Sequence, residues 1–302
     1  MTLTSSISPE AQSVLNAAPH ISLDRTASNL EKIRTQTRLF ITPAVTKILD
    51  THNVTVSSTE IMGVSCLLVH PSKLLVDWPI LYGFGGGFVS GSAFEDLTIA
   101  APISAFTGAI IIIPEYRLAP ENPWPAALDD AFNVYKTLAE QPFALVGESA
   151  GGNLALALIQ KAKKYGLPLP SALALLSPWC NLLNTGDSLN FNDGRDPVLS
   201  LRQITMAAQH FAGKNDLSMP EISPIFGHFD ASFPPCLIST ATRDLLLSQS
   251  VQLAHIMRDK NIQVDLQIWE GLWHVFEWDS ELPESEKSLK NISNFLVAHM
   301  VR

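Results

Sequence analysis

The stretch that decides the fold is LVGESAGGN, residues 145–153, which carries the pattern Gly-x-Ser-x-Gly around Ser149. An apolar run leads into Gly147, and a helical pattern covers residues 153–165. A serine between a strand and a helix, with a glycine two positions away on each side, is the pattern of a nucleophile elbow. The turn is so sharp that Gly147 and Gly151 must lack side chains, and the serine oxygen then projects above the sheet. The stretch alone leaves one alternative open, a glycine-rich strand–helix corner with a chance serine.

A second glycine-rich stretch, GFGGGFVSGS at residues 83–92, follows an apolar run at residues 78–82 that predicts a strand. Three consecutive glycines at a strand end let the backbone present successive N–H groups to a ligand. In a serine hydrolase such amides hold the oxyanion, so we expect Gly86 and Gly87 to be donors together with Ala150. The alternatives are a flexible turn and a phosphate loop, but a phosphate loop needs a Gly-Lys-Ser/Thr ending that is missing here.

Apolar runs that predict strands alternate with helical patterns from residue 54 onward. This alternation is typical of a mostly parallel sheet with helices on both faces, where ligands bind at the carboxyl ends of the strands. Residues 54–69 predict two antiparallel strands, broken near residues 57–59 and at Gly63. We expect further strands over residues 109–114, 143–146, 172–176, 235–241 and 263–269, and helices over 96–106, 125–139, 201–211, 249–260 and 284–299.

Three residues suited to a Ser-His-Asp triad each follow a predicted strand: Ser149, Asp244 and His274. Their order along the chain is the one expected for α/β-hydrolases. In this interpretation His274 accepts the Ser149 proton, Asp244 orients the imidazole, and an acyl-enzyme forms that water then releases. Asp265 and Glu270 are alternatives for the acid, but Asp265 lies inside a predicted strand and Glu270 lies on the same loop as His274.

Two regions break the strand–helix alternation. Residues 8–50 predict short helices divided by Pro19 and Pro43, and residues 182–230 are interrupted by glycine and proline around one amphipathic helix. We expect a single domain spanning residues 1–302, with a cap formed by about residues 1–50 and about residues 182–230. The apolar positions that would form one buried face of the N-terminal helices are Leu30, Ile33, Leu39 and Phe40.

Composition and charge exclude several classes of protein. The 302 residues are 46% hydrophobic and only 16% charged, which suits a large buried core. A net charge of −9 without a basic stripe argues against a nucleic-acid partner. Because no apolar run approaches a membrane span and residues 1–12 lack the regions of a signal peptide, we expect a cytoplasmic protein without membrane insertion. The widely spaced cysteines predict buried free thiols: Cys66, Cys180 and Cys236.

Five short motifs resemble those of the hormone-sensitive-lipase family of α/β-hydrolases, the bacterial class IV esterases. The resemblance runs from about residue 75 to the C-terminus, and it implies an eight-stranded sheet, a helical cap and frequent homodimers through the edge of the last strand. It also implies a serine carboxylesterase that acts on small-molecule esters and needs no cofactor. The motifs, in the family's order, are GGGF at 85–88, YRLAPE at 116–121, GESAGG at 147–152, DLL at 244–246 and HVF at 274–276.

Two positions depart from the family pattern. Phe84 stands where the family's oxyanion loop usually begins with a loop-stabilising histidine, so we expect Phe84 to be buried against apolar neighbours. Leu245 follows the acid where proline is common, and RDLLLS at 243–248 is similar to a subgroup that includes lactone hydrolases. The expected function is hydrolysis of short- to medium-chain acyl esters. A lactone hydrolase, an amidase and a non-catalytic ligand-binding protein on this fold are the alternatives.

Other residues near these motifs have structural interpretations. In the loop at residues 115–125, we expect Arg117 and Glu121 to be buried in hydrogen bonds, and Glu148 to orient the elbow. No metal-ligand spacing occurs in the chain. The aromatic residues that could line an acyl pocket, or equally form core packing, are Trp179, Phe211, Trp269, Trp273 and Trp278.

Overall fold

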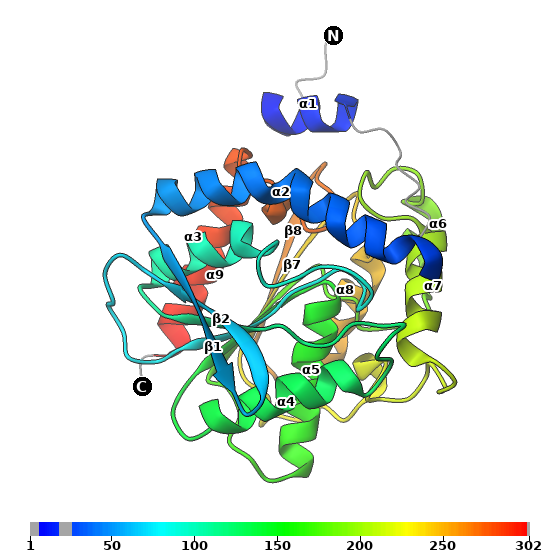
Figure 1. The fold of residues 1–302 in the computed structure, drawn as a ribbon. Coiled ribbons are helices and arrows are strands. Elements are labelled where there is room, and N and C mark those ends of the chain that lie inside the picture. Colours follow the sequence, from blue (N-terminus) through cyan, green and yellow to red (C-terminus); the bar gives the residue numbers. More distant parts are fainter. Residues whose placement is uncertain (1–5, 18–25, 301–302) are drawn as a thin grey trace.

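An eight-stranded sheet forms the centre of the computed structural model, which describes residues 6–17 and 26–300 (Figure 1). The strand order is β1-β2-β4-β3-β5-β6-β7-β8, in which β2 pairs antiparallel with both β1 and β4 and all other pairs are parallel. The expected mostly parallel sheet is confirmed. Its strands are β1 Thr55–Ile61, β2 Val64–His70, β3 Ile80–Gly83, β4 Ile111–Pro114, β5 Ala144–Glu148, β6 Ala172–Leu176, β7 Cys236–Ala241 and β8 Val264–Trp269.

The middle of the sheet is buried on both faces. Every residue of β4, β3, β5, β6 and β7 is buried, as expected for parallel strands that helices cover on each side. Strand β5 lies between β3 and β6, with Gly147 opposite Gly83 and Glu148 opposite Leu176. This register brings the chain that leaves β3 beside the residue that follows β5.

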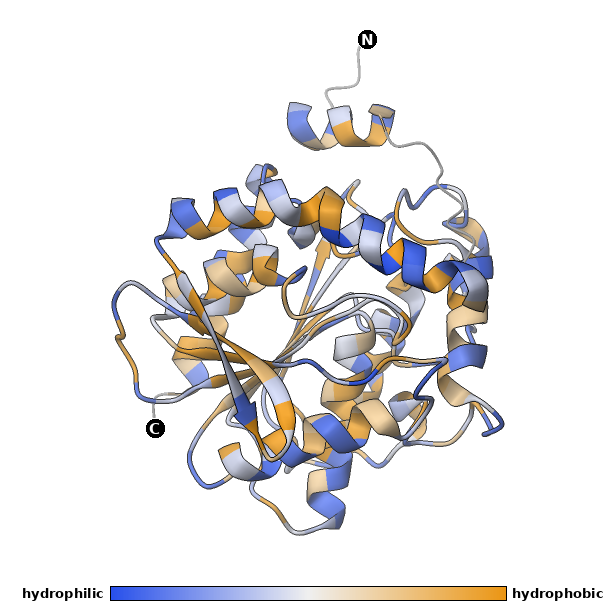
Figure 2. Ribbon diagram, in the orientation of Figure 1, coloured by the Kyte–Doolittle hydropathy of each residue, from blue (hydrophilic) through white to orange (hydrophobic). Residues whose placement is uncertain are grey.

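Helices cover the sheet in two groups. Helix α3 packs against α9 and α4 packs against α5, and the two pairs lie on opposite sides of the sheet (Figure 1). Hydrophobic residues dominate the central strands, whereas α2 alternates hydrophobic and hydrophilic turns (Figure 2). The helices are α1 Pro9–Ala17, α2 Leu30–His52, α3 Leu97–Thr107, α4 Ala126–Leu138, α5 Ala150–Lys164, α6 Asp187–Phe191, α7 Leu201–Ala212, α8 Leu247–Asp259 and α9 Pro283–Met300. Short 3-10 helices lie at Ala27–Asn29, Pro224–Phe226 and Phe276–Trp278 (η3).

The N-terminal helix α2 differs from the expectation in two respects. It is continuous through Pro43, because the proline lies on the exposed side, where a carbonyl that loses its N–H partner can bond to water. Leu39 and Phe40 are 69% and 77% exposed, so placing them on the buried face was wrong. Leu30 and Ile33 are buried as expected, and the rest of that face is Ile41, Val45 and Ile48. The break expected at Pro19 lies outside the described residues.

The boundaries of other strands and helices differ slightly from those predicted from the sequence. Strand β1 runs without a break through residues 57–59, because these polar residues lie on an edge strand where exposure is tolerated, and the chain turns only at Met62 and Gly63. Helix α5 begins at Ala150, directly after the serine, rather than at Asn153. The insertion at residues 182–230 contains the expected α7 and also the short α6. The three cysteines are free and buried, as expected.

In the part of the chain that the structure describes, no helix combines the length and the apolar character that crossing a membrane requires.

Candidate active site

Ser149 occupies a strained turn between β5 and α5. Its φ of 51° and ψ of −115° lie outside the regions that L-residues prefer, which is the usual conformation of a nucleophile elbow. A Cβ on Gly147 would lie 2.2 Å from the carbonyl oxygen of Gly151, and a Cβ on Gly151 would lie 1.9 Å from that of Gly83. The backbone of Ser149 is fixed in addition, because its N–H donates to the Leu176 carbonyl at 2.8 Å. Both glycines are therefore required by close backbone contacts, as the sequence predicted.

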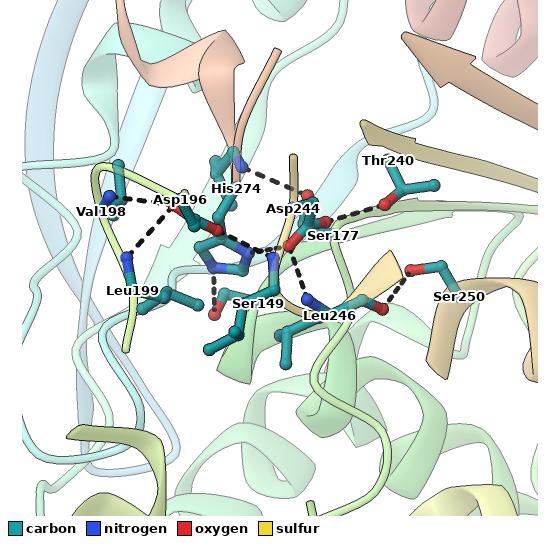
Figure 3. Close-up of polar contacts among 12 residues, drawn as sticks. Ser149, Ser177, Asp196, Val198, Leu199, Thr240, Asp244, Leu246, Ser250 and His274 are labelled. Atoms are coloured by element: carbon teal, nitrogen blue, oxygen red, sulfur yellow. Dashed lines mark hydrogen bonds and ion pairs between the residues drawn. The ribbon is translucent and has the colours of Figure 1, made fainter. Parts of the chain in front are cut away.

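The structure brings Ser149, His274 and Asp244 together in one line of hydrogen bonds (Figure 3). His274 Nε2 lies 3.0 Å from Ser149 Oγ, and His274 Nδ1 lies 3.0 Å from Asp244 Oδ1. All three residues are buried, with 7%, 3% and 0% of their surface exposed. Because Asp244 can only accept at Nδ1, that nitrogen carries the proton and Nε2 is free to accept the serine hydrogen. Asp265 and Glu270 are not part of this line.

Several neighbours hold the Asp244 carboxylate in place. Thr240 Oγ1 donates to Oδ2 and the Leu246 amide donates to Oδ1, both at 2.8 Å, and Ser177 adds a hydroxyl hydrogen bond. Burial alone would raise the pKa of Asp244. The positive charge and hydrogen bond of His274, together with these donors, outweigh burial and hold the pKa below its ordinary value. Asp244 is therefore a carboxylate suited to orienting an imidazole and stabilising its cation.

A second carboxylate, Asp196, lies beside His274 and Asp244 and was not identified from the sequence. It comes from the insertion, and its Oδ2 accepts the Leu245 amide at 2.8 Å (Figure 3). Its Oδ1 accepts the amides of Val198 and Leu199 at 2.9 and 3.2 Å. Burial raises the pKa of Asp196 to about 6; the charge of His274 opposes this shift and the charge of Asp244 adds to it. The only sequence signal was an Asp before a proline, which indicates a turn rather than a site.

The rest of that segment is also bonded to the acid loop at residues 242–248. Asn192 Nδ2 donates to the carbonyls of Thr242 and Asp244 at 3.1 and 2.9 Å. Ser188 Oγ donates to the Leu245 carbonyl at 2.8 Å. The insertion is thus fastened to the loop that carries Asp244, at positions directly next to the triad.

The loop that carries His274 has a strained backbone conformation, which hydrogen bonds keep in place. Val275 has a φ of 48°, an unusual value for a β-branched residue, and its N–H donates to Ser177 Oγ at 3.2 Å. Ser177 itself has a φ of 45°. Such conformations persist only where the surroundings fix them, so the position of His274 is determined by β6 and its following loop as well as by β8.

The glycine-rich loop after β3 folds tightly on itself. Gly86, Gly87 and Phe88 have φ values of 96°, 68° and 61°. The Gly86 carbonyl accepts the amides of Val89 and Ser90 at 3.3 and 3.1 Å and the Ser90 hydroxyl at 2.9 Å. These three hydrogen bonds close a turn in which Gly86 and Gly87 lead away from the end of β3, beside the elbow.

Phe84 is buried, as expected, and it stacks on Tyr116. The two ring centroids lie 3.9 Å apart with the planes 4° from parallel, and only 1% of Phe84 is exposed. The Tyr116 hydroxyl also donates to the Phe84 carbonyl at 2.6 Å. Tyr116 therefore holds both the side chain and the backbone of the residue that stands where the family resemblance predicts histidine.

Two buried carboxyl groups lie beneath this loop, on Asp96 and Glu148. They hydrogen-bond each other, and the Gly85 amide and the Trp278 side chain bond to Asp96. Tyr82 donates its hydroxyl to Asp96 Oδ2 at 3.0 Å. Burial raises the pKa of both groups, and the charge of Asp96 raises that of Glu148 further. The pair holds a proton between two acids, and it joins the glycine loop, the elbow and η3, which follows His274.

The expectation that Arg117 and Glu121 are buried was wrong, because both ion pairs lie at the surface. Arg117 binds Asp130 with two hydrogen bonds of 2.8 Å, yet its side chain is 53% exposed. Glu121 pairs with Arg34 and is 56% exposed. Trp179 and Phe211 are buried, and Phe211 stacks on Phe88 at 3.8 Å.

Among residues 6–17 and 26–300, no group of three or more His, Cys, Asp or Glu side chains is arranged to hold a metal ion.

Comparison with known proteins identifies the fold independently. A family model described as the alpha/beta hydrolase fold matches residues 80–278 of this chain. An esterase of Acinetobacter venetianus is 31% identical over 224 residues, which cover 72% of this chain and 73% of the relative. An acetyl-hydrolase of Streptomyces hygroscopicus is 30% identical, over 72% of this chain and 74% of the relative.

Solved structures agree over almost the whole length. The crystal structure of an esterase superimposes with a TM-score of 0.89 and 31% identity, covering 99% of this chain and 97% of the other. A hormone-sensitive lipase from a metagenome library gives a TM-score of 0.88 and 28% identity, over 96% of this chain and 98% of the other.

Proposed function

We propose that Ser149 is the nucleophile of this chain, which belongs to the α/β-hydrolase-fold family and is a hormone-sensitive-lipase-like carboxylesterase. The observation that carries the proposal is the line from Ser149 Oγ through both nitrogens of His274 to Asp244, with two contacts of 3.0 Å. A serine, a base that can accept its proton and an acid that orients the base are the parts that acyl transfer requires.

The reaction follows from the atoms in that line. Ser149 Oγ attacks the ester carbonyl carbon while His274 Nε2 takes the hydroxyl proton. As the carbon–oxygen bond to the alcohol breaks, His274 gives that proton to the leaving oxygen, and an acyl-serine ester remains. Water then attacks the acyl carbon while His274 takes a proton from it, and His274 returns that proton to Ser149 Oγ as the acyl–oxygen bond breaks and the acid leaves. Asp244, ionised because its pKa is lowered, stabilises the imidazolium in both steps.

The oxyanion that forms in each step needs donors beside Ser149. We assign this role to the amides of Gly86, Gly87 and Ala150. Ala150 is the first residue of α5, where helix N–H groups lack partners within the helix, and the register of β3 and β5 brings the glycine loop to the same place.

The substrates we propose are small-molecule esters with short to medium acyl chains. The acetyl-hydrolase among the relatives supports the short end of this range. We also propose that the N-terminal helices and the insertion form one cap on a single domain. In that arrangement the cap, rather than the sheet, sets the acyl preference.

A panel of p-nitrophenyl esters from acetate to laurate, with lactones and amides beside it, tests this function. We expect kcat/KM to be highest for short and medium acyl chains and to be abolished by Ser149→Ala. A fluorophosphonate should add one adduct per chain, on Ser149. Activity that survives Ser149→Ala would place the nucleophile elsewhere, and binding without turnover of any ester would favour the ligand-binding alternative.

Two further expectations belong to this proposal. We propose a homodimer through the outer edge of β8, where Ile268 is 47% exposed, and light scattering of the purified protein would give its mass in solution. We propose a cytoplasmic location, supported by three buried free thiols, and fractionation of the producing cells would test it.

A further inference from the structure

Arg34 is a side chain of α2 that contacts the glycine-rich loop from outside the sheet. Its Nε donates to the Val89 carbonyl and its Nη2 to the Ala119 carbonyl, each at 2.8 Å. The guanidinium also binds both carboxylate oxygens of Glu121 at 3.0 and 2.9 Å. One planar group thus joins α2 to two backbone segments. Both segments are buried, since Val89 and Ala119 are 0% and 1% exposed.

Val89 is the closing residue of the turn that carries the proposed oxyanion donors. Its N–H donates to the Gly86 carbonyl at 3.3 Å, so the two ends of the Gly86–Val89 turn are connected. Fixing the Val89 carbonyl fixes the outer end of that turn. The inner end, at Gly86, follows β3 closely, so its position is set by that strand.

Phe88, which lies in the turn between Gly86 and Val89, shows that the turn depends on contacts with other segments. Phe88 has a φ of 61°, a left-handed conformation that is strained for a non-glycine residue. Its carbonyl accepts the Ala119 amide at 2.9 Å, and its ring stacks on Phe211 of α7 at 3.8 Å. Arg34 binds the carbonyl of that same Ala119. Residues 88–89 are therefore held by the loop at residues 115–125 and by α7, and Arg34 bonds to both Val89 and that loop.

We propose that Arg34 is a positioning residue of the reaction, which sets the oxyanion turn through the Val89 and Ala119 carbonyls. This inference rests on the proposed function, because it assigns Arg34 to the loop that would hold the oxyanion. The exposed ion pair with Glu121 is a minor part of the role, since surface pairs contribute little to stability. Removing the guanidinium would leave two buried carbonyls without their donor and let the turn shift.

Four variants separate this role from a merely structural one. Arg34→Ala removes all four hydrogen bonds, Arg34→Lys keeps the charge but loses the planar fork, and Glu121→Gln removes only the ion pair. Lys47→Ala is the matched control, because Lys47 lies on the same helix and pairs with Glu281 at the surface. For each variant, kcat and KM are measured with p-nitrophenyl butyrate, together with the melting temperature and the Ki of a trifluoromethyl ketone.

Arg34→Ala should lower kcat about tenfold with KM within about twofold, because oxyanion donors act mainly in the transition state. The Ki of the ketone, which forms a tetrahedral adduct, should rise by the same factor. Arg34→Lys should fall between wild type and Arg34→Ala, Glu121→Gln should lose less than Arg34→Lys, and Lys47→Ala should match wild type. Millimolar guanidinium should restore part of the kcat of Arg34→Ala, while urea at the same concentration should not.

A wild-type kcat in Arg34→Ala, with or without a lower melting temperature, would overturn the positioning role. So would a rise in KM alone, which would assign Arg34 to substrate binding. Ser149→Ala in the same assays separates the two proposals: if it is inactive while Arg34→Ala behaves as wild type, only the inference on Arg34 fails. If Ser149→Ala stays active, the proposed function fails first.

Discussion

The proposed triad and the proposed oxyanion loop meet at Ser149, but the protein holds them in different ways. Ser149, Asp244 and His274 each follow a strand of the sheet, after β5, β7 and β8. The oxyanion loop begins at the end of β3, and no strand follows it before α3. Its shape depends instead on side chains from other segments, among them Tyr116 and Arg34.

This difference separates two kinds of support. The triad takes its positions from the sheet and from hydrogen bonds between neighbouring loops, so a local change should affect one member at a time. The loop is supported by the ring of Tyr116, the guanidinium of Arg34 and a buried acid pair, which are side chains of other segments. Changes far from Ser149 in sequence should therefore lower the rate through the loop.

The largest effect should come from the triad itself. Ser149→Ala should lower kcat/KM for p-nitrophenyl esters by at least ~10³-fold, because no other group can form the acyl-enzyme. Circular dichroism and melting temperature should match wild type, since only one hydroxyl is lost. The exposed Ser218 offers a control: Ser218→Ala should keep full activity and full fluorophosphonate labelling. Label on the Ser149→Ala protein would contradict the assignment.

The next effect is on stability and tests the acid pair beneath the oxyanion loop. The pKa of Asp96 is raised from 3.8 to about 6, so the folded protein binds a proton there that the unfolded chain releases. Stability from this group is complete below about pH 4 and is lost as pH rises through about 6, by on the order of 3 kcal/mol. Asp96→Asn should flatten this part of the stability profile.

Urea unfolding of wild type and Asp96→Asn at several pH values between 4 and 7 measures the two slopes. Other buried carboxyls contribute to both proteins, so the difference between the slopes is the quantity of interest. Equal slopes would mean that Asp96 takes up no proton on folding and would contradict its raised pKa.

The difference between the proposed triad and the oxyanion loop also explains which residues could be predicted from the sequence. The three residues of the proposed triad could be singled out because each follows a strand with a readable apolar run, and because their chain order is characteristic. Asp196 could not be found this way. It bonds to the Leu245 amide, 49 positions further along the chain, and a backbone group leaves no sequence pattern.

The predicted secondary structure has the same limit, because contacts between distant segments leave no local pattern. Central strands such as β6 and β7 were predicted to within one residue, because their apolar runs are bounded by polar and turn residues. Leu39 and Phe40 were misplaced because a helical pattern gives the spacing of a face but not which neighbours cover it. The role of Arg34 depends on the carbonyl of Val89, 55 positions away, and was equally hidden.

A smaller effect should come from the insertion's contact with the triad. Asp196→Ala leaves the amides of Leu245, Val198 and Leu199 without their acceptor, so the loop that carries Asp244 should shift. We expect kcat/KM to fall about tenfold, since a misplaced orienting acid costs less than a missing one. Asp193→Ala is the matched control, because that exposed carboxylate accepts the Leu201 amide at the start of α7. Equal activities in the two variants would show that the insertion does not position the acid.

The smallest effect should come from Phe84, and it separates packing from hydrogen bonding in the loop. Phe84→Ala removes the stack on Tyr116, which contributes about 1 kcal/mol beyond burial, so kcat should fall about fivefold while KM changes less. Phe84→Leu should recover part of this loss, because it refills the space without the ring. Phe84→His should not exceed wild type, although the family resemblance predicts histidine there. Phe84 is buried against the Tyr116 ring, and the Tyr116 hydroxyl is already bonded to the Phe84 carbonyl, so we expect an imidazole N–H there to be buried without a partner. A faster Phe84→His enzyme would show that the loop is still shaped for the histidine and that packing by Phe84 is a poorer substitute.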